Sequence, residues 1–336
     1  MKYIGFLISS IFIYLLFKDF NSNPNISISE FSSKVNILYF VIGIFFNLLA
    51  YIAHTLRWKT FFVSDKVKNI TFKTFFKTIL CGHFFNTILP SKAGELIRPY
   101  YFSKMTGVKY FTALSTCFVE RLFDGFTIIL MAVFSITLIF SSKFVFYNES
   151  LISTSAIYLI LILSPVLLIK NKKIILKITN HLPSKLKDIA ENLICESIEG
   201  FKQILTLGKF SKVLSSTLLY WTFSSIGMYF LLICCPLPPQ ITTPTVSILI
   251  ISVMGLVLVL PSAPANIGIY SYTLMIIFNQ LITNSALDLD VFNENYFTIS
   301  SIVIHLGAII PDIFFGGIAY LSMPSNLRGK LAHQNL

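Results

Sequence analysis

Two groups of charged residues interrupt apolar stretches of this sequence. The first lies in NTILPSKAGELIRPYYFSK, residues 86–104, where two prolines and a glycine break an apolar run. Arg98 and Lys92 can hold a phosphate at the end of a broken helix, where free backbone N–H groups assist. In the alternative interpretation, Glu95 and Arg98 only pair with each other, one helical turn apart. The break favours phosphate binding, and the candidate site residues here are Asn86, Pro90, Ser91, Lys92, Gly94, Glu95 and Arg98.

The second group is VERLFDG, which supplies the only charges between Lys109 and Lys143. Spacings of three and four residues allow Glu120, Arg121 and Asp124 to face one direction on a helix. We expect Arg121 to bind an anionic headgroup through its planar guanidinium while the two acids orient it. The alternative is a cluster at the membrane interface that only fixes the depth of the helix.

A third candidate is Asp312, in the last apolar stretch of the chain. An acid inside a membrane is a functional candidate, and Asp312 can neutralise Arg98 or Arg121 or bind a coupling proton. His305 lies two helical turns earlier on the same stripe. His305 and His83 are more simply interpreted as hydrogen-bonded packing residues.

The elements that must position these residues are apolar helices. Of the 336 residues, 55% are hydrophobic and only 12% are charged, and the mean hydropathy is +0.76. A soluble fold of this length cannot bury so much apolar surface. The sequence predicts an all-α polytopic integral membrane protein with about seven or eight hydrophobic elements.

Residues 3–17 form a shorter apolar run without a signal-peptidase site, which we interpret as an anchored first helix. The uncharged windows long enough to cross a bilayer are residues 35–56, 125–142, 150–169, 213–287 and 295–326.

The formal net charge of +11 is distributed unevenly along the chain. Of the 26 Lys and Arg residues, 22 lie at Lys2, in segments 57–77, 92–109 and 170–212, or in the C-terminal tail. Because basic residues stay on the cytoplasmic side, this bias places both termini in the cytoplasm and the chain in the cell membrane. No basic–aromatic platform accompanies the lysines, so we expect no nucleic-acid partner.

This topology constrains the first broken segment. Lys77 and Lys92 belong on the same side of the membrane, yet only 14 residues, TILCGHFFNTILPS, separate them. This apolar segment is too short to cross the bilayer and return. We therefore predict a re-entrant hairpin, and such a broken backbone at membrane depth must line a cavity or be buried in protein.

A second break, LVLVLPSAPANIGIYSY, covers residues 256–272. Both breaks pass from aliphatic residues into Leu-Pro-Ser and then reach a glycine, and both are flanked by apolar spans. The charge map gives the two halves opposite orientations, which predicts an inverted repeat with two re-entrant broken helices that meet at a substrate site. The alternative is that Leu-Pro-Ser recurs by chance. The second break adds the candidate residues Pro261, Asn266 and Gly268.

The rest of the chain indicates a single transmembrane domain over residues 1–336. Segment 170–212 has apolar residues at helical spacing between charges, as in an amphipathic cytoplasmic helix that lies on the membrane or covers the bundle. The five cysteines form no CxxC pair and no histidine cluster accompanies them, so we expect no metal or cofactor. No nucleotide-binding or nucleophile motif is present, and we expect no enzymatic activity.

The motifs N-x-x-L-P-S-x-x-G-E-x-x-R (86–98) and E-R-x-x-D (120–124) resemble the lysylphosphatidylglycerol synthase transmembrane region. This resemblance implies a flippase-like integral membrane protein, and it implies the membrane part without the soluble aminoacyltransferase domain. The family pattern at the second break is roughly P-G-G-x-G-x-x-E. Here Ala265 and Asn266 occupy glycine places and Ser271 occupies the place of the acid, which argues against a role that needs a carboxylate there.

The sequence therefore predicts movement of an anionic phospholipid or a polyprenyl-phosphate-linked glycolipid across the membrane. A membrane lipid is the expected partner. The alternative is a non-catalytic accessory subunit that holds an envelope glycosyltransferase or another cell-envelope enzyme at the membrane. A membrane enzyme that uses Glu95, Glu120 and Asp124 as acid and base groups is the least favoured interpretation.

Overall fold

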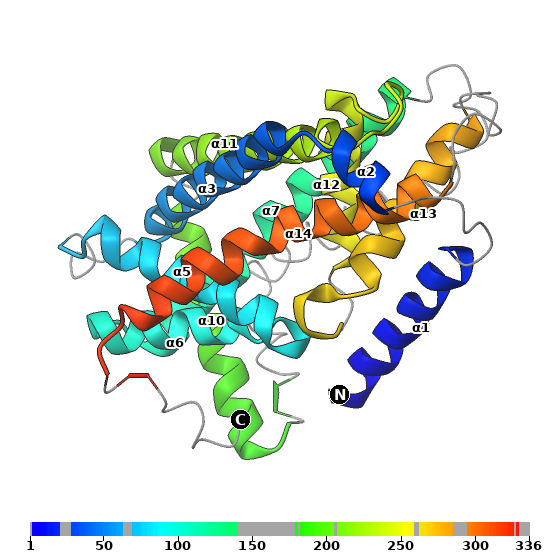
Figure 1. Ribbon diagram of the computed structural model, residues 1–336. Coiled ribbons are helices and arrows are strands. Elements are labelled where there is room, and N and C mark those ends of the chain that lie inside the picture. Colours follow the sequence, from blue (N-terminus) through cyan, green and yellow to red (C-terminus); the bar gives the residue numbers. More distant parts are fainter. Residues whose placement is uncertain are drawn as a thin grey trace.

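The computed structural model describes residues 2–20, 28–62, 69–139, 179–180, 182–204, 207–258, 262–284, 294–325 and 327–328 (Figure 1). Every element in this part of the chain is helical, which confirms the all-α prediction. The elements are α1 (Lys2–Phe20), α2 (Ile28–Lys34), α3 (Ile37–Thr60), α5 (Phe72–Ile88), η1 (Pro90–Lys92), α6 (Gly94–Thr106), α7 (Tyr110–Ile139), α10 (Ser184–Ile204), α11 (Leu207–Ile233), α12 (Pro244–Val257), η3 (Pro264–Asn266), α13 (Ile269–Asn284) and α14 (Glu294–Leu321).

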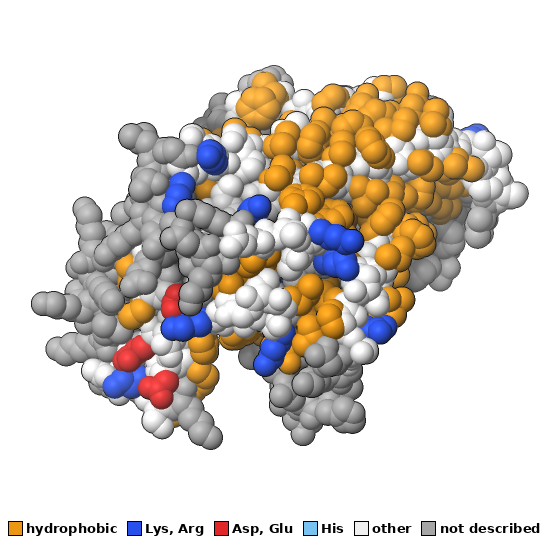
Figure 2. All heavy atoms as spheres, turned by 90° about the vertical axis from the view of Figure 1, so that its left-hand side faces the viewer, with side chains coloured by type: hydrophobic (Ala, Val, Ile, Leu, Met, Phe, Trp, Pro, Cys, Tyr) orange, Lys and Arg blue, Asp and Glu red, His pale blue; other side chains and the backbone are white. Residues whose placement is uncertain are grey.

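Several helices have the length and composition of membrane spans. Among the described residues five helices qualify, and α12 is a shorter apolar helix. Large apolar side chains in the spans are exposed, such as Phe45 at 54% and Phe314 at 59%. Figure 2 shows a broad apolar surface bordered by Lys and Arg side chains. The chain is a multi-pass membrane protein whose exposed apolar faces suit contact with lipid. The predicted window at residues 150–169 lies outside the described part.

Among the described helices, α3 and α11 form the most extensively packed pair, and they lie side by side in Figure 1. They are antiparallel, because Tyr39 near the start of α3 contacts Phe230 near the end of α11, with ring centroids 6.0 Å apart. At the crossing point, a Cβ added to Gly43 would lie 3.1 Å from the carbonyl oxygen of Gly227, and the converse distance is also 3.1 Å. Glycine at both positions therefore allows the close approach of the two backbones.

The helix order α3–α5–η1–α6–α7 recurs as α11–α12–η3–α13–α14. Packing between the two sets is reciprocal: α5 packs on α14, α12 packs on α7, and η1 contacts η3. The antiparallel pairing of α3 with α11 gives the two sets opposite directions. This arrangement has the order and the direction that the predicted inverted repeat requires.

The first break closes a tight hairpin. A Cβ on Gly94 at the start of α6 would lie 2.0 Å from the carbonyl oxygen of Gly82 in α5, and the ring of Phe75 near the start of α5 lies 4.7 Å from that of Phe102 near the end of α6. The helices α5 and α6 are therefore antiparallel and in contact, as a re-entrant hairpin requires.

The second break differs from the first. The helix that follows it, Pro264–Thr283, is long and apolar enough to cross a membrane. It packs against α14, with the rings of Tyr270 and His305 stacked 4.4 Å apart. The physical reason for the difference is charge: Glu95, Arg98 and Lys104 keep α6 short and partly polar, whereas α13 carries no charged residue.

The amphipathic segment contains the helix α10, which packs on α7 and α11. The hydroxyl of Thr112 on α7 donates to Glu196 of α10 at 3.0 Å. Of the two predicted placements, this contact agrees with a helix that covers the bundle. Its cytoplasmic location stays a prediction.

Candidate functional site

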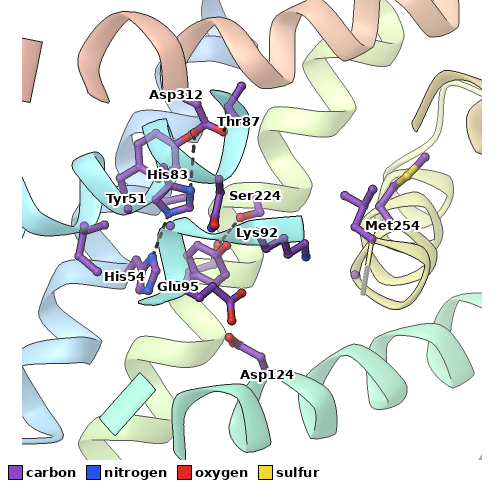
Figure 3. Close-up of a pocket in the computed structure, with 18 of the residues that line it drawn as sticks. Tyr51, His54, His83, Thr87, Lys92, Glu95, Asp124, Ser224, Met254 and Asp312 are labelled. Atoms are coloured by element: carbon purple, nitrogen blue, oxygen red, sulfur yellow. Dashed lines mark hydrogen bonds and ion pairs between the residues drawn. The ribbon is translucent and has the colours of Figure 1, made fainter. Parts of the chain in front are cut away.

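A cavity of about 290 Å³ lies between the two repeats, and helices of both sets contribute to its wall (Figure 3). Both breaks reach it, through Lys92 of η1 and Asn266 of η3. The structure thus brings the two sequence breaks to one place. Nine of the predicted site residues line this cavity: Asn86, Lys92, Gly94, Glu95, Arg98, Arg121, Asp124, Asn266 and Asp312.

Glu120 lies behind the cavity wall and is fully buried. Its carboxylate accepts from Arg57 at 2.7 Å and from Arg98 at 2.8 Å, and it also contacts His54 Nε2. Arg121, the next residue along the chain, is 3.3 Å away. A buried carboxylate is stable only when it is paired and hydrogen-bonded, and Glu120 meets this condition through three arginines.

Asp124 is the second buried acid of α7. It accepts from Arg57 at 2.5 Å and from the indole N–H of Trp221 at 3.2 Å, and it lies 3.3 Å from Arg121. The predicted direction of Glu120, Arg121 and Asp124 toward one side of α7 therefore agrees with the structure. Together they join α7 to α3, α6 and α11.

The basic segment that the sequence predicts after the second span begins at residue 57, and for Arg57 this placement outside the helix is wrong. The helix α3 continues to Thr60, and Arg57 is 0% exposed inside the bundle. Its guanidinium lies over the ring of Tyr220 at 4.9 Å, in addition to its two acidic partners. Burial of this charge is possible because α7 supplies two carboxylates at hydrogen-bond distance.

Arg98 does not form the ion pair with Glu95 that the alternative interpretation of the first break gave it. It pairs with Glu120 rather than with Glu95, and its side chain covers the ring of Trp58 at 4.7 Å. The reason is the hairpin, which directs this side of α6 toward α7 and α3. Arg98 is only 6% exposed, so its charge is largely used within the protein.

Glu95 instead pairs with Arg121, 3.6 Å away. These two side chains are the exposed members of the group, at 36% and 43%. They therefore mark the side on which the cavity opens.

Lys92 differs from the three arginines in having no partner. No ion pair or hydrogen bond to its ammonium group occurs among the residues that the structure describes. Its backbone is left-handed, with φ 52°, a conformation that is uncommon outside glycine. Arg57, Arg98 and Arg121 are matched by Glu95, Glu120 and Asp124, so Lys92 leaves this part of the cavity with one excess positive charge.

Asp312 lies on another side of the cavity, next to His83 (Figure 3). It accepts from the hydroxyls of Tyr51 and, at 2.9 Å, Thr87, and it is 3.6 Å from His83 Nδ1. The predicted pairing of Asp312 with Arg98 or Arg121 is wrong, because the antiparallel packing of α14 on α5 turns this acid toward α5 and α3.

His305 is a packing residue, as the sequence suggested. Its Nε2 lies 2.8 Å from the carbonyl oxygen of Ala265 in η3, and its Nδ1 is 3.3 Å from the hydroxyl of Ser271. The two sides of the imidazole ring are therefore occupied by the second break and by α13.

Pro90 and Gly268 are not among the described residues that line the cavity. Pro90 and Ser91 begin η1, and Pro261 lies outside the described residues. Gly268 has φ 86°, and a Cβ there would lie 2.7 Å from the carbonyl oxygen of Ser9. This glycine therefore permits contact between the second break and α1.

Sequence reasoning missed the contribution of α3. Tyr51, His54 and Arg57 are spaced three residues apart and form one polar stripe on this helix. That spacing within an apolar span was the signal that could have identified them. Tyr220 and Trp221 on α11 had no comparable signal, because aromatic residues are frequent in every span.

Comparison with known proteins identifies the family of the chain. Residues 3–287 match the family described as the lysylphosphatidylglycerol synthase TM region. The chain belongs to this family. It is also 32% identical over 182 residues to the UPF0104 membrane protein MJ1595 of Methanocaldococcus jannaschii. That match covers 50% of this chain and 52% of the relative, so the chain spans about half the length of the curated relative it matches. No solved structure matches the chain.

Proposed function

We propose that the cavity binds the headgroup of an anionic lipid and that the protein moves this lipid across the cell membrane. The observation that carries the proposal is Lys92, a cavity-lining ammonium group without a partner beside a charge-balanced cluster. A phosphate would supply the missing negative charge. Lysine binds phosphate as a point charge, and burial strengthens the attraction.

A second cavity supports a lipid rather than a small soluble anion. It measures about 400 Å³, lies between α7, α11 and α12, and carries no charged side chain among its described lining residues. Trp221 lines both cavities. A hydrocarbon chain in the uncharged cavity and a phosphate in the polar one would fit a single amphipathic molecule.

The arrangement of the two repeats supports movement rather than static binding. Transporters built from inverted repeats bind substrate where two broken helices meet and expose that site to each side in turn. Here η1 and η3 are in contact and both border the cavity. We propose that the substrate is an anionic phospholipid or a polyprenyl-phosphate-linked glycolipid, moved without chemical change, and that both termini are cytoplasmic.

The proposal predicts that purified protein in phosphatidylcholine vesicles exchanges fluorescent phosphatidylglycerol between leaflets. Exchange is read by adding dithionite, which reaches only the outer leaflet. Lys92→Gln should lower the rate at limiting lipid by an order of magnitude or more, because a buried charge-assisted contact is worth roughly 1.5–3 kcal/mol. Fluorescent phosphatidylcholine should exchange slowly in both proteins.

The matched control is Lys104→Gln, which removes the same charge from the last turn of α6, outside the cavity. It should exchange phosphatidylglycerol like the wild type. Folded wild-type protein that exchanges neither phosphatidylglycerol nor a polyprenyl phosphate would contradict translocation. That result would favour the accessory-subunit alternative, in which loss of α10 abolishes partner binding.

A further inference from the structure

Four titratable side chains, three on the cavity wall and one behind it, form a continuous series that the binding of a headgroup does not explain. We call Glu120, His54, His83 and Asp312 the acid–histidine chain. Glu120 contacts His54 Nε2. His54 Nδ1 is 3.3 Å from His83 Nε2, and His83 Nδ1 is 3.6 Å from Asp312 (Figure 3). Each imidazole therefore has one nitrogen toward each neighbour, which is the arrangement that passes a proton through a ring.

We propose that the acid–histidine chain carries protons and that lipid movement is coupled to their passage; this inference rests on the proposed function. A proton from Asp312 would bind His83 Nδ1 while His83 releases its Nε2 proton to His54 Nδ1. His54 in turn would release its Nε2 proton to Glu120. No other bond changes, and the passage leaves each ring in its opposite tautomer. A proton that moves back from Glu120 to Asp312 restores the first tautomers, and a second proton can follow in the same direction only after each ring has exchanged its proton between its two nitrogens. Histidine suits this role because its ordinary pKa is about 6.5.

The contacts of His54 connect proton position to the broken hairpin. Its Nε2 faces Glu120, which can only accept a hydrogen bond, and Arg98 Nη1 at 3.0 Å, which can only donate one. With a proton on Nε2, His54 binds Glu120 and repels Arg98. Without that proton, Nε2 accepts from Arg98. Because Arg98 belongs to α6, the proton on His54 biases the position of the helix that follows the first break.

The acid–histidine chain spans both repeats. Glu120, His54 and His83 belong to the first set of helices, on α7, α3 and α5, whereas Asp312 belongs to the second set, on α14. Tyr51 donates its hydroxyl to Asp312 and packs its ring on His83 at 4.5 Å, and Thr87 donates to Asp312 as well. A change of charge on Asp312 or His83 therefore acts on the contact between repeats. Among the described residues, the other titratable and charged groups that face the acid–histidine chain are Tyr51, Arg57, Arg98, Arg121, Asp124 and Tyr220.

The test uses full-length protein in phosphatidylcholine vesicles that contain fluorescent phosphatidylglycerol, with and without a pH gradient. With the gradient, the fluorescent lipid should accumulate in one leaflet of wild-type vesicles. Without the gradient, it should be distributed equally between the two leaflets. In His83→Gln, whatever exchange remains should be identical with and without the gradient. His305→Gln is the matched control, since it also replaces a buried histidine, and glutamine can still donate to the Ala265 carbonyl oxygen; it should keep the response.

Two results separate this inference from the proposed function. Wild-type exchange that ignores the gradient, or a full gradient response in His83→Gln, would overturn the inference and leave lipid movement intact. Absence of any exchange from folded wild-type protein would overturn both.

A spectroscopic measurement covers the case in which His83→Gln does not exchange lipid at all. In protein labelled with ¹⁵N at histidine, the His83 signal, assigned by its loss in His83→Gln, should change protonation state between about pH 5 and 8. Added phosphatidylglycerol should shift that titration. A His83 signal that stays in one protonation state throughout, with and without lipid, would overturn the inference.

Discussion

At the scale of single residues, the site separates charges that hold the protein together from charges left for a ligand. Arg57 and Glu120 are completely buried and satisfy each other, whereas Glu95 and Arg121 are partly exposed. An exposed pair contributes little, because water screens it. Removal of one partner from a buried pair leaves an uncompensated charge and costs much more.

This difference predicts unequal effects of two similar substitutions. Glu120→Gln should destabilise the folded protein by about 3–5 kcal/mol, since Arg57 and Arg98 then lack their shared carboxylate. Glu95→Gln, which removes the acid of the exposed pair, should cost less than about 1 kcal/mol. Thermal unfolding in detergent, followed by loss of the monomer peak, compares the two. Equal losses of stability would contradict the assignment of Glu120 as a structural centre.

The residue scale is also where sequence reasoning reached its limit. The unusual residues Lys92, Glu95, Arg98, Arg121, Asp124 and Asp312 could be recognised because each stands out in an apolar context. Their partners could not be, since pairing depends on which helices meet. Arg98 paired with Glu120 rather than with its sequence neighbour Glu95 because tertiary packing, not local spacing, decides which carboxylate is closest.

At the scale of elements, the α5–η1–α6 hairpin places the first charged group on the cavity. Its tightness depends on Gly94, whose Cα faces the backbone of α5. A side chain at this position would separate the two helices and displace Lys92 and Arg98 together.

The hairpin was predictable from the sequence, because a short apolar segment whose basic ends lie on the same side of the membrane can adopt few other conformations. The length of α13 was not, since a proline-containing break does not fix how far the next helix continues.

Gly94→Ala should therefore disrupt the site, because the added Cβ would lie 2.0 Å from the Gly82 carbonyl oxygen and 2.6 Å from Asn86 N. We expect loss of phosphatidylglycerol exchange together with lower thermal stability. Gly125→Ala is the matched control: a Cβ at Gly125 meets nothing within 4 Å, and alanine in a helix is favoured over glycine by roughly 1 kcal/mol. A Gly94→Ala protein as stable and active as Gly125→Ala would show that the hairpin is not held this closely.

At the scale of the whole molecule, two oppositely directed sets of helices enclose one polar cavity. The recurrence of Leu-Pro-Ser predicted this repeat only weakly, and the reciprocal packing of α5 on α14 and α12 on α7 now supports it. Such symmetry allows two conformations of similar energy, related by the pseudo-two-fold axis of the repeats, each of which opens the cavity to one side. We propose that the cavity alternates between these two openings.

Accessibility of the cavity from each side of the membrane tests this claim most directly. Ser224 lies on α11 and lines the cavity, so Ser224→Cys can be labelled with a membrane-impermeant thiol reagent added inside or outside vesicles. Ser215→Cys, at an exposed position of the same helix, controls for orientation, and the wild type gives the background of the native cysteines. We predict that Ser224→Cys reacts from both sides and that phosphatidylglycerol slows both reactions, while Ser215→Cys reacts from one side. Reaction of Ser224→Cys from one side alone, with or without lipid, would contradict alternating access and describe a static chamber.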